Sequence, residues 1–314
     1  MLRSIWEDVK REFGYGNMVT RIVIVNVAVF FLIHLVNLIL FISNGAKPSP
    51  LFEQVVNFFC MSSDWKFLLT HPWGIFTSMF LHENFWHLLW NMLYMYWFGR
   101  IVGDFIGNQR VLPIYLAGGI VGGILFFVTA NLMPYGAGGA RFALGASGAV
   151  MAMVVAAGVI APDYIMRILF IGDVKLKYIV LVLVLLDLIG IANDINTGGH
   201  FAHIGGALTG LIFVRQLRAG NDWSLPINHI LNKIGAFFVR LRQGQERGPK
   251  VVYKNPTRTA ARQTTRKAAA VSNYAEEDMP YQEQLDAILD KIKQSGYDSL
   301  SENEKEFLFN ASKK

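Results

Sequence analysis

The sequence predicts an all-α membrane protein, in which six transmembrane helices form one bundle and a small cytoplasmic helical tail follows. Hydrophobic residues make up 53% of the 314 residues, charged residues only 17%, and the mean hydropathy is +0.35. Soluble domains carry about 25% charged residues. The charge is also unevenly distributed, since 25 of the first 219 residues are charged against 27 of the last 95. These figures exclude an ordinary soluble domain, and the single cysteine, Cys60, excludes a disulfide scaffold.

Six apolar segments within residues 21–217 come close to the length of about 20 residues that a helix needs to cross the hydrocarbon core. The predicted spans cover roughly residues 21–43, 82–99, 111–133, 144–161, 178–194 and 200–217. The first span is not a cleavable signal peptide, because it starts at Arg21 after a polar N-terminus and no small-residue cleavage site follows it. Residues 1–20 form a cytoplasmic N-terminal segment, of which residues 2–13 have the pattern of an amphipathic helix on the membrane surface.

The basic residues of the short loops predict the orientation, because Lys and Arg concentrate on the cytoplasmic side. With the N-terminus inside, nine basic residues face the cytoplasm and three face outward. The inner set is Arg3, Lys10, Arg11, Arg21, Arg100, Arg110, Arg167, Lys175 and Lys177, and the outer set is Lys47, Lys66 and Arg141. Both termini are therefore predicted to be cytoplasmic. The long outer loop, residues 44–81, holds Trp65, Trp73 and several phenylalanines, which indicates a segment lying in the membrane interface.

Polar side chains within the spans are costly and mark candidate functional positions. In LHENFWHLLWNM, His87 and Asn91 are four residues apart and therefore share one face of a helix, while His82 lies near the outer end. Hydrogen bonding between helices is the alternative role for such residues. His34 and His200 are treated as structural or interfacial.

Ser147 follows a Gly-rich loop in FALGASGAV and begins a helix of about 15 residues, too short for a full span. The loop before it must therefore dip into the membrane, which is tolerated only where the backbone packs in protein or lines a water-filled cavity. A serine at a helix N-terminus lies beside free N–H groups and the positive end of the helix dipole, where an oxyanion could be stabilised. The alternative is a serine bonded to its own helix backbone.

His203 lies in AHIGGALTG, and Gly206 and Gly210 follow it at a spacing that permits close helix contact. This contact would let the sixth span approach the fourth, and His203 could then reach Ser147, as an activated nucleophile requires. Asp187, near the outer end of the fifth span, has three open roles: it caps backbone, faces water or orients His203. We expect no carboxylate on the faces that carry His82, His87, His200 and His203, and therefore no metal site.

HENFWHLLWNM, GASGAV and AHIGGALTG, on spans two, four and six, resemble the motifs of rhomboid intramembrane serine proteases. The resemblance covers roughly residues 20–217, and YLAGGIVGGI looks like the third span of that family. It implies a Ser–His dyad without an acidic third member and without a cofactor. Ser147 matches the nucleophile and His203 the general base. It also implies a bacterial inner-membrane protein with a short C-terminal cytoplasmic extension.

The resemblance also implies the roles of the residues around the dyad. His87 and Asn91 match the side-chain donors of the oxyanion hole, with the Ser147 N–H as a backbone donor. The residues that match positions near the site are His82, Gly145, Gly148, Met151, Gly206 and Gly210. Two positions depart from the family pattern. Gly74 stands where Arg often follows Trp in the first outer loop, and Met151 stands where many members place an aromatic residue against the catalytic histidine.

Two regions follow the bundle. Residues 218–279 are predicted to be a basic, mostly disordered linker able to lie on anionic lipid, and its composition supports no nucleic-acid partner. Residues 280–314 predict a small helical hairpin that would need a cytoplasmic partner to cover it. The pattern of this hairpin is apolar residues at helical spacing, a stop at Gly296 and a capping box from Ser301 to Glu304.

The function that the sequence predicts is cleavage of transmembrane proteins near the outer end of their membrane segment by Ser147 and His203. Peptide hydrolysis needs a nucleophile, a base and water in one cavity, and all the candidates lie toward the outer ends of their helices. The alternative is a non-catalytic rhomboid-like module that binds membrane segments for quality control. A metal site or transporter built from the histidines is a second alternative.

Overall fold

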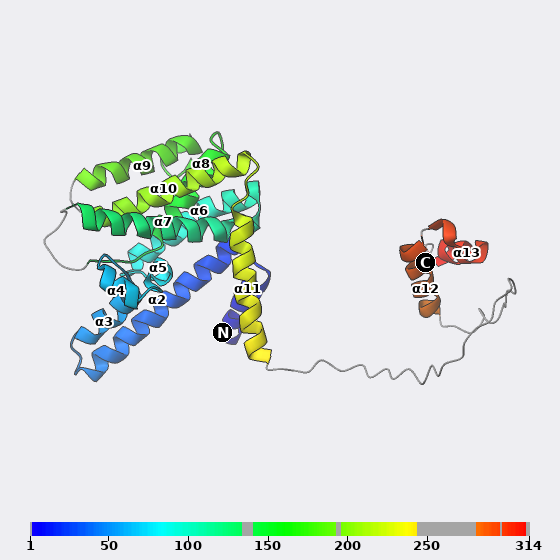
Figure 1. Ribbon diagram of the computed structural model, residues 1–314, viewed down its shortest axis with the longest axis horizontal. Helices are drawn as coiled ribbons and strands as arrows, with labels where there is room; N and C mark the ends of the chain where they lie inside the picture. The colour runs from blue at the N-terminus through cyan, green and yellow to red at the C-terminus, as the bar shows by residue number, and fades with distance from the viewer. Residues whose placement is uncertain (1, 134–140, 193–195, 244–280, 296, 312–314) are drawn as a thin grey trace, which may run out of the picture. The chain divides into compact units, whose positions relative to one another are not determined.

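The computed structural model describes residues 2–133, 141–192, 196–243, 281–295 and 297–311. The chain divides into two compact units, Met1–Glu246 and Arg247–Lys314. In the first unit, six helices lie at the predicted spans. They are α2 (Met18–Ser43), α6 (Phe85–Ile106), α7 (Val111–Leu132), α8 (Ser147–Ile160), α9 (Leu176–Ala192) and α10 (Thr197–Arg218). The fold is thus an all-α bundle, in which α6–α10 run side by side while α2 crosses obliquely (Figure 1).

Helix α8 is the central helix of the bundle. It packs against α6, α7 and α10, and ten of its 14 residues are buried, so its surroundings are protein and not lipid. Its sequence, SGAVMAMVVAAGVI, is made of small and medium-sized apolar residues, which lets the neighbouring helices approach closely. A short helix enclosed on all sides places its first residue, Ser147, inside the bundle.

Glycines make the closest of these contacts. Gly206 of α10 lies directly against the carbonyl oxygen of Gly148, and a side chain at this position would clash with it. One turn later, Gly210 lies in the same way against the carbonyl oxygen of Ala152. The spacing of Gly206 and Gly210 therefore brings α10 onto α8, the contact that His203 needs in order to approach Ser147.

Residues 44–81 contain short elements in place of a flexible loop. They are α3 (Pro50–Phe59), β1 (Met61–Ser62), α4 (Trp65–Thr70), α5 (Gly74–Thr77) and the 3-10 helix η1 (Ser78–Phe80). Strand β1 pairs antiparallel with β2 (Phe142–Ala143), with Met61 opposite Ala143. This pairing ties the segment to the residues that lead into α8.

The Trp73–Gly74 departure has a structural reason. Gly74 lies against the backbone carbonyl of Cys60, where any side chain would clash, so an arginine would not fit there. The segment is held instead by Trp73, whose indole N–H donates to the carbonyl oxygen of Phe58 at 2.7 Å. Thr77 adds a second bond, from its hydroxyl to the carbonyl oxygen of Phe59 at 2.6 Å.

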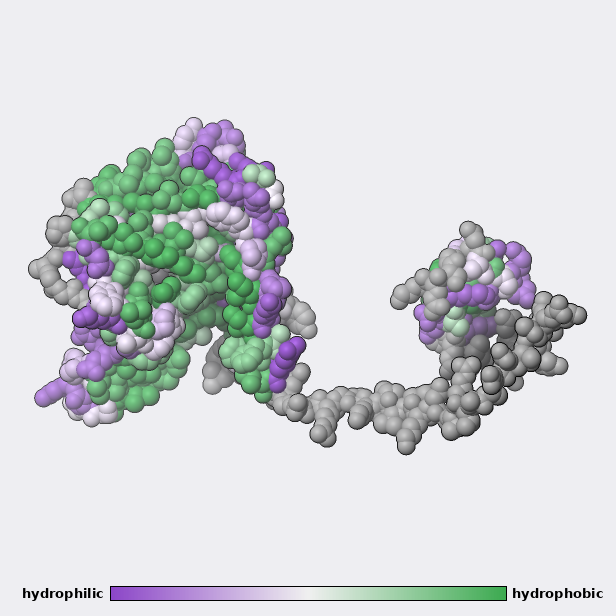
Figure 2. Space-filling view, in the orientation of Figure 1, coloured by the Kyte–Doolittle hydropathy of each residue, from purple (hydrophilic) through white to green (hydrophobic). Residues whose placement is uncertain are grey.

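The surface of the bundle is largely hydrophobic (Figure 2). Within the described residues, two segments are long and apolar enough to cross a membrane by length and composition alone, Met18–Ser43 and Asn108–Leu132. Helix α2 leaves many large apolar side chains uncovered, with Phe31 67% exposed and Ile42 66% exposed. Apolar exposure on this scale marks a surface that meets lipid or another apolar partner.

The region after the bundle differs from the prediction in one respect. A disordered linker was expected from residue 218, but helix α11 (Ser224–Gln243) occupies its first part. Residues 224–243 carry a helical apolar stripe that the basic composition of the longer segment conceals. The remainder of the predicted linker, residues 244–279, and the predicted stop at Gly296 lie outside the described residues.

The second unit contains α12 (Tyr281–Ser295), the 3-10 helix η3 (Tyr297–Ser299) and α13 (Glu302–Ala311). Both hydrogen bonds of a capping box are present at the start of α13. The Ser301 N–H donates to the Glu304 carboxylate at 2.7 Å, and the Glu304 N–H donates to the Ser301 hydroxyl at 3.4 Å. Lys291 also donates to Glu304 at 2.7 Å and so joins α12 to α13.

Candidate active site

One cavity of about 1120 Å³ lies between α6, α8, α9 and α10, and His82 is the predicted site histidine that does not line it. Most of the side chains that the sequence singled out are present in its wall. They are Ser147, His203, His87, Asn91, Met151, Asp187 and His200. A cavity of this size holds water and a peptide segment together, which is the space that hydrolysis of a peptide requires.

Ser147 is the first residue of α8, and its half-buried side chain faces the cavity. Gly145, two residues before it, has a φ of +125°. Residues with a side chain rarely adopt this backbone conformation. The N–H of Gly145 donates to the carbonyl oxygen of Ser78 at 2.9 Å, which fixes the turn before the helix. The first N–H groups of α8, including that of Ser147, have no partner within the helix and can bind a negatively charged oxygen.

His87 and Asn91 enter the cavity from the first two turns of α6. The helix begins at Phe85 and is capped by Asn84, whose side-chain oxygen accepts from the His87 N–H at 2.9 Å. The Asn91 amide donates one of its two hydrogens to the His87 carbonyl oxygen at 2.8 Å, which leaves one for a ligand. The His82 ring packs edge-on against the His87 ring, with centroids 5.1 Å apart.

The absence of a side chain at Gly145 makes room for the His87 imidazole. A Cβ atom there would lie 2.8 Å from His87 Nε2 and 3.8 Å from Ser147 Oγ. The imidazole and the hydroxyl thus both lie close to one glycine. Because His87 Nε2 is this close to the start of α8, the histidine can donate to an oxyanion formed beside Ser147.

His203 is held by Asp187. The Nδ1 atoms of His203 and His200 both lie 2.7 Å from Asp187 Oδ1. An ionised carboxylate only accepts hydrogen bonds, so it favours the tautomer of each neutral imidazole that carries the proton on Nδ1. In that tautomer the Nε2 atom of His203 keeps its lone pair, which is the form that a general base needs.

The contact differs from two expectations. No carboxylate was expected beside the histidines, and the resemblance implied a dyad without an acidic third member, but Asp187 lies between His200 and His203, bonded to both, and its side chain is only 10% exposed. The orientation of α9 about its own axis places Asp187 toward α10, and apolar periodicity within α9 does not reveal this orientation. The ligand atoms of these three residues lie within 4.8 Å of one another, so among the described residues they form a group that could hold a metal ion.

Some residues lie apart from the site or were overlooked. His34 is bonded within α2 to the Phe30 carbonyl oxygen at 2.9 Å and lines a separate small cavity. Trp86, Trp90 and Tyr94 line the main cavity but were not predicted to do so. Their spacing of four residues on α6 was the available signal, because it gives them a common helix face.

Comparison with known proteins identifies the fold. A Rhomboid domain model matches residues 69–219. The putative rhomboid protease YdcA of Bacillus subtilis is 31% identical over 150 residues, which are 46% of this chain and 68% of that protein. This chain belongs to the rhomboid family. Members of the family are integral membrane proteins, which accounts for the apolar surface of the bundle.

Two further rhomboids match over smaller shares of their length. The rhomboid protease GluP of Bacillus subtilis is 28% identical over 242 residues, 76% of this chain and 39% of that protein. The mitochondrial presenilin-associated rhomboid-like protein A of Danio rerio is 27% identical over 143 residues, 44% of this chain and 35% of that protein. The chain thus spans well under half of these two relatives.

The two matched regions correspond to different parts of the structure. The rhomboid match contains every residue of the candidate site, from His82 to Gly210, and ends just after α10. A family of unknown function (DUF6576) matches residues 272–314, the part that holds α12 and α13. Helix α11 lies between the two matches.

Proposed function

We propose that this rhomboid is an intramembrane serine endopeptidase that cleaves transmembrane proteins with Ser147 as nucleophile and His203 as general base. The observation that supports this most strongly is the hydrogen bond between Asp187 and His203 Nδ1 at 2.7 Å, because it leaves Nε2 as a proton acceptor in the cavity that Ser147 lines. The reaction needs no cofactor.

In the acylation step, the Ser147 hydroxyl attacks the scissile carbonyl carbon and transfers its proton to His203 Nε2. The negative charge on the carbonyl oxygen is bound by the N–H of Ser147 and by donors from His87 and Asn91. His203 then donates the proton to the leaving amine, the C–N bond breaks, and an ester remains on Ser147. A water molecule activated by the same nitrogen cleaves the ester and restores the hydroxyl.

The substrate class follows from the position of the site in the membrane. Ser147 begins α8, and most of the basic residues expected on the cytoplasmic side lie at the other end of the bundle. The cavity is thus proposed to open to the outer side, where it meets the outer end of a substrate's membrane segment. A substrate backbone in extended form would find hydrogen-bond partners in the cavity, and the family resemblance favours small residues at the cut.

The experiment is cleavage of a tagged transmembrane substrate by the purified protein in liposomes, with Ser147→Ala as control. We expect cleavage by the wild type, none by the variant, and labelling of Ser147 by a fluorophosphonate probe. Equal cleavage by both proteins would refute the role of Ser147. Substrate binding without cleavage or labelling would instead favour the non-catalytic module. Loss of wild-type activity with a chelator would favour a metal at Asp187, His200 and His203.

A further inference from the structure

Helix α11 starts at the end of the bundle that is remote from Ser147. In Figure 1, the axes of α6–α10 run nearly in one direction, and α11 starts beside the beginning of α7 and runs nearly perpendicular to these axes in this view. This end contains the C-terminus of α8, where the Arg218 guanidinium donates to the Val159 carbonyl oxygen at 2.6 Å. Because rhomboid helices cross the membrane along the bundle, a helix that is perpendicular to them at this end runs along the membrane surface.

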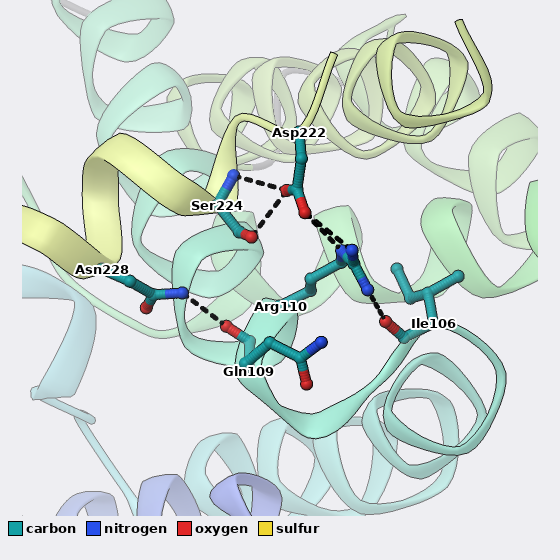
Figure 3. Close-up of polar contacts among 6 residues, drawn as sticks. All are labelled: Ile106, Gln109, Arg110, Asp222, Ser224 and Asn228. Atoms are coloured by element: carbon teal, nitrogen blue, oxygen red, sulfur yellow. Dashed lines mark hydrogen bonds and ion pairs between the residues drawn. The ribbon is translucent and has the colours of Figure 1, made fainter. Parts of the chain in front are cut away.

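A partly buried ion pair fixes the start of α11 to this end (Figure 3). Arg110, which ends the 3-10 helix η2 (Asn108–Arg110), donates from Nε and Nη2 to Asp222 Oδ2 at 2.9 and 2.7 Å. The other carboxylate oxygen accepts from the N–H and the hydroxyl of Ser224 at 2.9 and 2.6 Å. Burial alone would raise the pKa of Asp222, but the bonds from Ser224 and Arg110 hold it below its ordinary value.

A second contact lies one turn further along α11. The Asn228 amide donates to the carbonyl oxygen of Gln109 at 3.0 Å (Figure 3). The neighbouring residue of η2, Asn108, accepts from the first N–H of α2, that of Met18, at 2.7 Å. The same short corner therefore positions both α2 and α11. After these contacts α11 continues with exposed side chains on all its faces.

The exposed part of α11 has one continuous apolar face. Ile230, Ile234, Phe237, Phe238 and Leu241 follow helical spacing, and each is between 49% and 63% exposed. Five large apolar side chains at this exposure are too many for a helix that faces water.

One flank of the helix, beside the apolar face, is polar and basic. His229, Lys233 and Arg240 are exposed and fall along one line of the helix, and α11 contains no acidic residue. In Figure 2, hydrophobic colour from the bundle continues onto the side of α11 toward the bundle, and hydrophilic colour follows the side away from it. The apolar face is therefore directed toward the hydrocarbon layer that the bundle spans, and the basic flank away from it.

We propose that α11 is an interfacial anchor helix, with its apolar face in the acyl-chain boundary and its basic flank on the headgroups of acidic lipid. An amphipathic helix with Lys and Arg beside a Phe- and Leu-rich face binds in this way. The apolar surface of the bundle is continuous with the face, and the basic flank complements anionic headgroups. The pair of Arg110 and Asp222 sets the level at which the helix enters the interface.

The test compares two variants that each add one cysteine, Ile234→Cys on the apolar face and Asn232→Cys on the other side. The native Cys60 thiol is buried, and burial raises its pKa to about 12, so the unsubstituted protein is the control for labelling. Each full-length variant carries a bimane label in nanodiscs, with acyl-brominated lipid or aqueous iodide as quencher. Thermal unfolding shows whether each variant folds as the wild type does.

We expect brominated lipid to quench the label at position 234 and iodide to quench the label at position 232. Replacing neutral with acidic lipid should increase lipid quenching at 234, and K233Q/R240Q should remove the increase. Iodide quenching at both positions would overturn the proposal. Protection of position 234 from both quenchers would overturn it too, because another copy or the tail would then cover the face. Equal quenching in neutral and acidic bilayers would overturn the role of the basic flank.

Discussion

Asp187 and Asp222 organise polar contacts in two different regions of the bundle. Asp187 accepts from two imidazoles in the wall of the cavity, and Asp222 accepts from a guanidinium and a hydroxyl at the start of α11. A histidine bound through Nδ1 keeps a lone pair on Nε2, whereas a guanidinium has no acceptor atom. The partner of the carboxylate therefore decides what it can do: Asp187 can support proton transfer, and Asp222 can only fix a helix.

The largest effect should come from the groups that react in the cavity. Ser147→Ala and His203→Ala should each lower turnover by at least about 10⁴-fold, because nucleophile and base act as one unit. The measurement is cleavage of a tagged membrane substrate in liposomes. Thermal unfolding is the control. If a folded variant keeps turnover within tenfold of wild type, the residue replaced in it takes no part in the reaction.

His87 and Asn91 should come next. Each alanine variant should lower turnover by about 10²–10³-fold if the side chain binds the oxyanion. Substrate binding, measured with these variants in a Ser147→Ala background, should stay unchanged. Asn91 also bonds to the His87 carbonyl oxygen, so its variant requires a stability measurement. A loss of binding equal to the loss of turnover would contradict a role in the transition state.

Asp187→Asn tests the site aspartate directly. Loss of one hydrogen bond to a charged group is worth about 1.5–3 kcal/mol, so turnover should fall by about 10- to 100-fold. The readout specific to positioning is the ¹⁵N spectrum of His203, which should show Nδ1 protonated in the wild type and a mixture in the variant. His200→Phe is the matched control, since it removes the second bond to Asp187 and keeps the first. An unchanged His203 spectrum in Asp187→Asn would refute the positioning role.

The smallest effect on activity is expected for the Asp→Asn substitution at Asp222. Asp222→Asn should leave turnover within about twofold of wild type while hydrogen exchange at the start of α11 accelerates. The folded-state pKa of Asp222 is lowered, so its stabilisation is present above the unfolded pKa and is lost as pH falls through the folded value. Acid should therefore lower the protection of the α11 amides, measured relative to their intrinsic exchange rate at the same pH, in the wild type and change it little in the variant. A large loss of turnover in Asp222→Asn would contradict the different roles proposed for Asp187 and Asp222.

The bundle could be predicted because length and apolarity decide which segments cross a membrane. The third span was predicted at 111–133 and is found at Val111–Leu132. The start of α8 at Ser147 was predicted from the glycines before it and the shortness of the run. Helix α11 was not predicted, because the basic composition of residues 218–279 is typical of a disordered linker. The apolar spacing that indicates a helix is confined to residues 224–243.

The sequence predicted which residues form the candidate site better than it predicted the contacts between them. Glycines at 206 and 210 predicted the approach of α10 to α8, since small residues permit close packing. The bond from His203 to Asp187 depends on how far α9 is rotated about its own axis. Because α9 is apolar on nearly all its faces, its sequence pattern does not show which face is turned toward α10.

The shortness of α8 sets a length scale for the reaction. Fourteen residues at about 1.5 Å each span roughly 21 Å, while the hydrocarbon core is about 30 Å thick. If the C-terminal end of α8 lies at the inner boundary of the core, the proposed nucleophile lies several ångströms below the outer headgroups, and a thicker bilayer buries it further. Turnover should then depend on acyl-chain length, so the composition of the surrounding membrane becomes a determinant of which peptide bonds the proposed protease can reach.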